Sequence, residues 1–268
     1  MTVLMQISDP HFGTEQPPVV EALVTLTHAQ RPDLLVLSGD ITQRARPSQF
    51  RAARAFMDRL GGPVLAIPGN HDLPLFDVAA RLWRPYASYR KAFGEELEPV
   101  HESSEALVVG VNTTRTYRHK NGQVGRAQIE RVAQRLRAAT PGQLRVVVVH
   151  QPVVVTHAED WPDRLRNRTA ALSCWAKAGA DLVLGGHIHL PFVMPLKGLA
   201  RPVWAVQAGT AVSSRVRRGV PNSVNLLRWC EPGVEPGTCV VEQWDFSPAT
   251  RAFVRGPVTP VQPARVQA

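Results

Sequence analysis

The sequence has no long hydrophobic run and few cysteines. No stretch approaches the ~18 consecutive apolar residues of a membrane-spanning helix, and the acidic Asp9 comes before any signal-peptide core could develop. The three cysteines, Cys174, Cys230 and Cys239, have no CxxC spacing, which excludes a disulfide framework and a thiolate metal site. We therefore expect a cytoplasmic protein with no membrane association and with three buried thiols.

What remains is the composition of a folded globular protein, with 44% hydrophobic and 20% charged residues. The length of 268 residues fits one large domain or two small ones, and we take residues 1–256 as a single domain. Beyond Gly256 the chain has Pro257, Pro260 and Pro263 with few large apolar residues. This pattern predicts an extended or disordered tail over residues 257–268.

The formal charge is +9, from 31 Lys and Arg against 22 Asp and Glu. Such a surplus can attract a phosphate-bearing substrate or nucleic acid. The basic residues are scattered, however, as in Arg44, Arg46 and Arg51, and form no known nucleic-acid module. Solvated surface is therefore the simpler interpretation, and a small phosphorylated partner is favoured over nucleic acid.

Short β-branched runs alternate with helical patterns along most of the chain. Strands are predicted at residues 3–7, 34–38, 64–67, 107–111, 146–149 and 182–184. Helices are predicted at residues 19–30, 48–60, 126–138 and 169–178. This order indicates a largely parallel sheet covered by helices. Later strands, at 203–206, 224–229 and 239–246, have no helix between them and predict a second, mixed sheet.

Polar motifs follow five of the predicted strands. They are Asp9-x-His11, Gly39-Asp40, Gly69-Asn70-His71-Asp72, His150 and Gly186-His187-Ile188-His189. Because the carboxyl ends of parallel strands lie at one edge of a sheet, we expect these residues to converge. The alternative is that each motif is turn chemistry or a satisfied core histidine, and five of the nine histidines would then lie at strand ends by coincidence.

The motifs offer carboxylate, imidazole and amide ligands but no thiolate, which suits Mn, Fe or Zn. Seven ligands are too many for one tetrahedral ion but suit a pair of ions ~3.5–4 Å apart. Asp40 is the residue we expect both ions to share. The candidate ligands are Asp9, His11, Asp40, Asn70, His150, His187 and His189.

In this order the motifs resemble those of the calcineurin-like metallophosphoesterase superfamily, whose signature is D-x-H, GD, GNH[DE], H and GHxH. The resemblance covers about Met1 to Gly209. Residues 7–11, 38–42 and 67–72 are similar to bacterial class III cyclic-nucleotide phosphodiesterases. One departure is Gln151-Pro152-Val153, where many class III relatives carry His-Pro-Pro; it removes no ligand but changes the expected pocket.

The resemblance implies an α/β fold, a four-layer α-β-β-α sandwich with two mixed sheets. It also implies how the ligands divide between two divalent or mixed-valence ions. One ion would be held by Asp9, His11, Asp40 and His189, and the other by Asp40, Asn70, His150 and His187.

Two cations that share Asp40 would lower the pKa of a water between them and aim the bridging hydroxide at phosphorus. His71 lies beside Asn70 but is not needed as a ligand, so it is the expected proton donor to the leaving oxygen. Asp72 is expected to orient His71 and hold it protonated. The alternative for His71 is that it only packs beside the metals.

We therefore expect a metal-dependent phosphoric ester hydrolase, with a small phosphodiester such as a cyclic nucleotide as substrate. The alternatives are a nuclease, a phosphomonoesterase and a non-catalytic metal-binding scaffold. Scaffold proteins of this fold tend to lose the residue that corresponds to His71, so its presence favours catalysis. The sequence leaves the oligomeric state open, with a homodimer among the alternatives.

Several further residues are weaker candidates. Arg44 and Arg46 follow the Gly39-Asp40 motif and are placed to reach a phosphate or ribose, although surface solvation explains them too. His119 and His157 are candidates for the pocket rim. The aromatic residues of the segment after the third motif could wall a nucleobase, or could pack between helices: Trp83, Tyr86 and Tyr89.

Overall fold

The strands form two six-stranded sheets in the computed structural model, which describes residues 1–230, 233–235 and 237–263. In the first sheet the order is β12-β11-β10-β1-β2-β3, with β1, β2 and β3 parallel and the other pairs antiparallel. Its strands are β1 (Thr2–Ile7), β2 (Leu34–Ser38), β3 (Val64–Ile67), β10 (Ser223–Trp229), β11 (Cys239–Ser247) and β12 (Ala252–Val261).

The second sheet has the order β4-β5-β6-β7-β9-β8, with antiparallel pairs at its two edges and parallel pairs between them. Its strands are β4 (Val100–Glu102), β5 (Ala106–Gly110), β6 (Leu144–Val148), β7 (Leu182–Gly185), β8 (Phe192–Pro195) and β9 (Trp204–Gln207). Two mixed sheets are therefore confirmed. The expectation that the first six predicted strands share one sheet is wrong, because three of them lie in each sheet.

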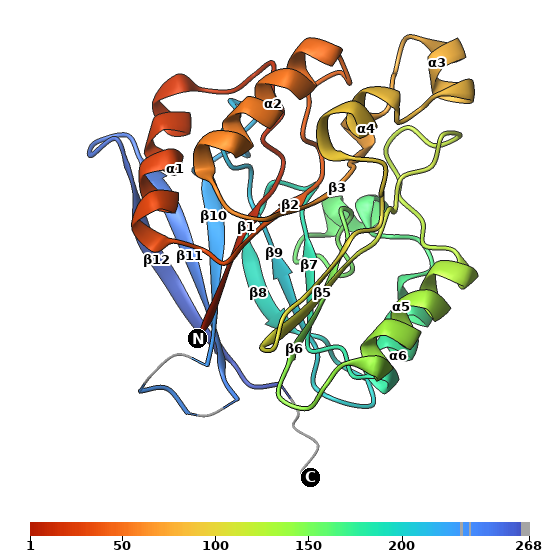
Figure 1. The fold of residues 1–268 in the computed structure, drawn as a ribbon, viewed down its shortest axis with the longest axis vertical. Coiled ribbons are helices and arrows are strands. Elements are labelled where there is room, and N and C mark those ends of the chain that lie inside the picture. The colour runs from red at the N-terminus through yellow and green to blue at the C-terminus, as the bar shows by residue number, and fades with distance from the viewer. Residues whose placement is uncertain (231–232, 236, 264–268) are drawn as a thin grey trace.

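Helices cover the outer face of each sheet (Figure 1). α1 (Pro17–Gln30) and α2 (Pro47–Leu60) lie on the first sheet, and both begin at a proline, which suits the first turn of a helix. α5 (Arg126–Ala138) and α6 (Arg168–Ala178) lie on the second sheet. The four predicted helices are confirmed, and α3 (Val78–Trp83) and α4 (Ala87–Phe93) add two that the sequence pattern did not predict.

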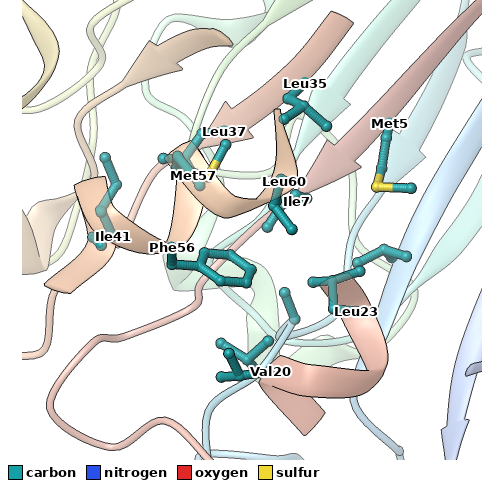
Figure 2. Packing of buried hydrophobic residues seen from close by; sticks show 14 of the residues in the cluster. Met5, Ile7, Val20, Leu23, Leu35, Leu37, Ile41, Phe56, Met57 and Leu60 are labelled. Atoms are coloured by element: carbon teal, nitrogen blue, oxygen red, sulfur yellow. The ribbon is translucent and has the colours of Figure 1, made fainter. Parts of the chain in front are cut away.

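Three hydrophobic clusters fill the spaces between these four layers. In β1, Val3, Met5 and Ile7 pack toward α1 and α2, whereas Leu4 faces the second sheet, as the two-residue period of a strand requires. Figure 2 shows Met5, Ile7 and their neighbours packed between the first sheet and its helices. Apolar residues on both faces of the central strands therefore produce the four-layer α-β-β-α sandwich.

Two expectations about the rest of the chain need correction. Residues 257–261 are extended, one of the two expected alternatives, but they are not a separate tail, because they continue β12, which pairs with β11 at the sheet edge. Residues 264–268 of the expected tail lie outside the described part. Cys239 is buried, but Cys174 is half-buried and Cys230 is exposed, so the expected burial of all three thiols is wrong. Within the described ranges, no helix is both long and apolar enough to cross a membrane.

Candidate metal centre

The motif residues lie where the carboxyl ends of strands from both sheets meet. Asp9, Asp40 and Asn70 follow β1, β2 and β3 of the first sheet, and His150 and His187 follow β6 and β7 of the second. Hydrogen bonds cross between the sheets at this end: Gln6 Nε2 donates to the Gly185 carbonyl at 2.9 Å. The motifs therefore converge as predicted, but on an edge shared by two sheets rather than on one.

Five of the candidate ligands have a left-handed backbone. The φ values are 50° at Asp9, 43° at His11, 47° at Asp40, 75° at His187 and 54° at His189. Non-glycine residues rarely adopt φ in this range, and such strain gathers at functional sites when the surrounding structure enforces it. The strain turns these side chains from the strand ends toward a common centre.

The ligand atoms form three overlapping groups, in each of which they lie within 4.8 Å of one another. Asp40 belongs to two of them and joins the His11 side of the site to the His150 side. The groups are Asp9, His11 and His189; His11, Asp40 and His71; and Asp40, His150 and His187. All these residues are buried or half-buried, so water does not screen them fully.

Pairs of hydrogen-bond acceptors face each other inside these groups. His189 Nδ1 donates to the Arg215 carbonyl at 2.6 Å, which leaves the Nε2 lone pair facing Asp9 Oδ1 at 3.2 Å. In the same way, His150 Nε2 faces Asp40 Oδ1 at 3.2 Å. Two facing acceptors repel unless a proton or a cation lies between them. Ligand atoms ~2.1 Å from one ion lie about 3.0–3.4 Å apart, so these distances fit a bound cation.

Five buried polar atoms at the site, two of them in these facing pairs, have no hydrogen-bond partner among the described residues. They are Asp9 Oδ1, Asn70 Oδ1, His150 Nε2 and both ring nitrogens of His187. The nearest carboxylate oxygen recorded for His187 Nε2 is Asp163 Oδ1 at 3.9 Å, too far for a hydrogen bond. Because buried polar atoms are normally satisfied, unpartnered oxygens and imidazole nitrogens fit divalent cations.

The electrostatics of the site favour ionised carboxylates at Asp9 and Asp40. Burial opposes ionisation, but His189 and His150 hold the pKa of the Asp9 carboxyl below its usual range, and His150 does the same for Asp40. Burial also lowers the pKa of His11 to about 3. At His150 burial is outweighed by Asp40, which raises the pKa of the imidazole to about 9.

His71 lies beside these groups with both ring nitrogens engaged. Its Nδ1 lies 3.0 Å from the Gln43 carbonyl oxygen and its Nε2 lies 3.2 Å from Arg215 Nη1. A carbonyl only accepts and a guanidinium only donates, so these contacts assign a neutral His71 with its proton on Nδ1. The backbone nitrogen of His71 donates to Asp40 Oδ1 at 2.8 Å.

The predicted contact between Asp72 and the His71 ring is wrong. The buried Asp72 carboxylate accepts hydrogen bonds from the backbone nitrogens of Ile41, Thr42 and Gly69 at 2.8–3.0 Å, and from the Thr42 hydroxyl at 2.9 Å. Asp72 therefore ties the loop after β2 to the loop after β3. This carboxylate positions the loops that carry Asp40 and Asn70.

Arg215 is the site residue that the sequence reasoning missed. Its guanidinium Nη1 contacts His71 and Gln43, the latter at 3.0 Å to Oε1, and its carbonyl orients His189. The residue lies in a basic run, Arg215-Val216-Arg217-Arg218, that follows β9. Its position after a predicted strand was the one feature of the sequence that could have indicated Arg215 as a site residue.

The weaker candidates differ in where they lie relative to the metal centre. Arg44 and His119 line a cavity of about 10 Å³ beside His71, space for about one water. The Arg44 guanidinium also lies over the Phe76 ring, 5.4 Å from its centroid. Tyr89 is buried and packs in the core, whereas Trp83 is 78% exposed. Arg46 directly precedes α2, and His157 is exposed.

Residues 2–191 match the model of a known protein family, the calcineurin-like phosphoesterases, and these residues include every candidate ligand. The chain belongs to the calcineurin-like phosphoesterase family. This phosphoesterase is 26% identical over 202 residues to a probable cyclic nucleotide phosphodiesterase of Synechococcus, which covers 71% of this chain and 74% of the relative. The family and its relatives identify a metal-dependent phosphoric ester hydrolase.

Two further comparisons concern a shorter segment and the fold. The phosphoesterase is 37% identical over 83 residues to the glycerophosphodiester phosphodiesterase GpdQ of Enterobacter lignolyticus, 26% of this chain and 29% of that one. A dimetal phosphatase from Danio rerio has the same fold, with a TM-score of 0.66, 12% identity, and coverage of 98% of this chain and 99% of its own. The family and the clusters together imply divalent metal ions.

Proposed function

We propose that this phosphoesterase hydrolyses small phosphodiesters at a centre of two metal ions. The observation that supports this most strongly is the position of Asp40, whose carboxylate oxygens face His11 Nε2 at 3.8 Å on one side and His150 Nε2 at 3.2 Å on the other. A carboxylate between two groups of imidazole nitrogen and carboxylate or amide oxygen atoms suits a ligand shared by two cations.

The proposed ligand set is the one expected from the motifs. Asp9, His11 and His189 would hold one ion with Asp40, and Asn70, His150 and His187 the other with Asp40. When bound, the ions supply Lewis-acid stabilisation of the phosphoryl oxygens and a water of lowered pKa. Ser38 and Arg215, through their carbonyl oxygens, fix the tautomers of His150 and His189, so that Nε2 of each is free to coordinate.

His71 is the proposed proton donor to the leaving oxygen. Its backbone contact with Asp40 and its place beside Asn70 keep its ring at the centre. In the neutral form assigned above, Nε2 accepts from Arg215, so donation requires a proton on Nε2 and separation of that nitrogen from the guanidinium. His71 would therefore donate only after this contact has opened and Nε2 has taken up a proton.

The proposed substrates are small phosphodiesters such as cyclic nucleotides, with Mn, Fe or Zn as the metals. The relative from Synechococcus supports a cyclic nucleotide, and the shorter match to GpdQ supports a glycerophosphodiester. The donor set of carboxylate, imidazole and amide supports these metals, because it lacks thiolate. The +9 charge is consistent with an anionic substrate.

The test is hydrolysis by metal-free protein reloaded separately with Mn, Fe or Zn. The substrates are cyclic AMP, a glycerophosphodiester, bis(p-nitrophenyl) phosphate, p-nitrophenyl phosphate and DNA. We expect the small diesters to be cleaved faster than the monoester and the DNA, and activity to be absent without metal. Preferred cleavage of DNA, or no hydrolysis of any substrate after reloading, would reject the proposal.

A further inference from the structure

Arg215 and Arg217 lie in the same loop but differ in their ion pairing. Arg217 is neutralised by Asp160, at 2.9 Å to both carboxylate oxygens, and by Glu159. For Arg215 the described residues include no carboxylate within ion-pair distance, and its recorded side-chain contacts are with Gln43, His71 and His11. Arg215 thus brings an uncompensated positive charge to the candidate metal centre.

One nitrogen of the Arg215 guanidinium carries all of these contacts. Nη1 lies 3.0 Å from Gln43 Oε1, 3.2 Å from His71 Nε2 and 3.5 Å from His11 Nδ1. Nε and Nη2 have no hydrogen-bond acceptor in the described part of the chain, and the side chain is half-buried. A guanidinium held at one corner keeps its other N–H groups available in a fixed orientation.

The geometry of this arrangement suits a phosphoryl group. Arginine binds phosphate oxygens through two parallel N–H groups, and pre-orientation of the guanidinium reduces the entropy lost on binding. Gln43 and His71 supply that orientation. The positions of Nη1 beside His71 Nε2 and near His11, a candidate ligand, place the guanidinium at the edge of the candidate metal centre.

We propose that Arg215 binds a non-bridging oxygen of the substrate's phosphate, and that Gln43 and His71 position its guanidinium. The inference rests on the proposed function for the identity of the substrate, but the anion contact itself requires no turnover. It assigns the site to substrates that carry negative charge on the reacting phosphate, which phosphodiesters and phosphomonoesters do and neutral phosphotriesters do not.

The experiment measures the binding of inorganic phosphate to the metal-loaded protein by calorimetry. The variants are Arg215→Gln, Arg215→Lys and the control Arg218→Gln, which removes an exposed charge from the same loop. Charge-assisted hydrogen bonds contribute about 1.5–3 kcal/mol, so we expect Kd to rise roughly 10- to 100-fold in Arg215→Gln. A smaller rise is expected in Arg215→Lys and none in Arg218→Gln.

Every variant keeps the backbone carbonyl of residue 215, which orients His189. A substitution there could still shift this carbonyl, so metal content is measured in every sample. If Arg215→Gln loses metal, the comparison passes to Arg215→Lys, where phosphate affinity equal to that of the wild type at equal metal content would overturn the proposal. A Kd within twofold of the wild type in metal-loaded Arg215→Gln would also overturn it.

The phosphate affinities, together with the hydrolysis rates of the wild type, separate this inference from the proposed function. If the wild type hydrolyses none of the phosphodiesters but its phosphate affinity depends on Arg215, the proposed function fails and the anion contact stands. If hydrolysis occurs and phosphate affinity does not depend on Arg215, the anion contact fails alone.

Discussion

His150 Nδ1 lies 2.9 Å from the carbonyl oxygen of Ser38, and this contact joins the two sheets at the candidate metal centre. Ser38 ends β2 in the first sheet, and His150 follows β6 in the second. The carbonyl can only accept, so Nδ1 carries a proton, and Nε2 is directed at Asp40, which favours a second proton there in the metal-free protein. The packing of the two sheets therefore sets the protonation and direction of a candidate ligand.

The first prediction is that metal affinity rises with pH. Burial opposes protonation of His150, but Asp40 raises its pKa to about 9, and Asp9 raises the pKa of His189 against the same opposition. At neutral pH the metal-free protein therefore carries protons that a cation must displace. His11 and His187 have lowered pKa values and contribute no such proton.

Each proton that the metal displaces makes its affinity depend more steeply on pH. Zn affinity should therefore rise about tenfold per pH unit between pH 6 and 8, and more if His189 is also protonated. Competition with a chromophoric chelator, corrected for the chelator's own protonation, measures this. An affinity that stays constant over this range would contradict the protonation assigned to His150.

The second prediction concerns the close approach of Gly69 to Asp40. A β-carbon at Gly69 would overlap the backbone nitrogen and Oδ1 of Asp40. Gly69→Ala should therefore displace Asp40, lower the metal content and reduce the free energy of unfolding by roughly 1–3 kcal/mol. Gly125→Ala is the matched control, because a β-carbon there meets its nearest atom at 3.5 Å. Equal metal content in the two variants would argue against the predicted displacement of Asp40.

The sequence predicts the strands, the main helices and the convergence of the ligands because each has a local signal. α5 (Arg126–Ala138), for example, has the predicted bounds, since its apolar residues follow a helical period and its ends are marked. α3 was missed because it has no buried residue and hence no apolar stripe. Pro257 and Pro260 appeared to end the fold, yet an edge strand such as β12 tolerates proline.

Long-range pairing was the part that the sequence did not determine. An apolar run indicates that a strand is buried on both faces but not which strand lies beside it. The strand pattern therefore predicted a second sheet but not the division that places β1, β2 and β3 in one sheet and β5, β6 and β7 in the other. Arg215 was missed for the same reason, because it is separated from His71 by 144 positions. The expected contact between Asp72 and His71 failed because backbone N–H groups of two loops take the carboxylate.

The third prediction follows from those bonds of Asp72. In Asp72→Ala the buried backbone N–H groups of Ile41, Thr42 and Gly69 lose their acceptor, and each unsatisfied group costs about 1–3 kcal/mol. Asp72→Asn keeps one oxygen and should lose less stability. Chemical denaturation of both variants measures the difference, and a loss below about 1 kcal/mol in Asp72→Ala would show that the two loops do not depend on this carboxylate.

The last prediction tests His71 as the proton donor. His71→Gln removes the imidazole proton but keeps an oxygen that can accept from Arg215, whereas His71→Ala removes both. Loss of a general acid should lower kcat by roughly 100- to 10,000-fold for an alkoxide leaving group, as in cyclic AMP, and far less for p-nitrophenolate, which leaves without a proton. Both variants should show this dependence on the leaving group. If His71→Gln keeps wild-type kcat on cyclic AMP while His71→Ala does not, His71 serves only to position Arg215, and the proton must come from another group.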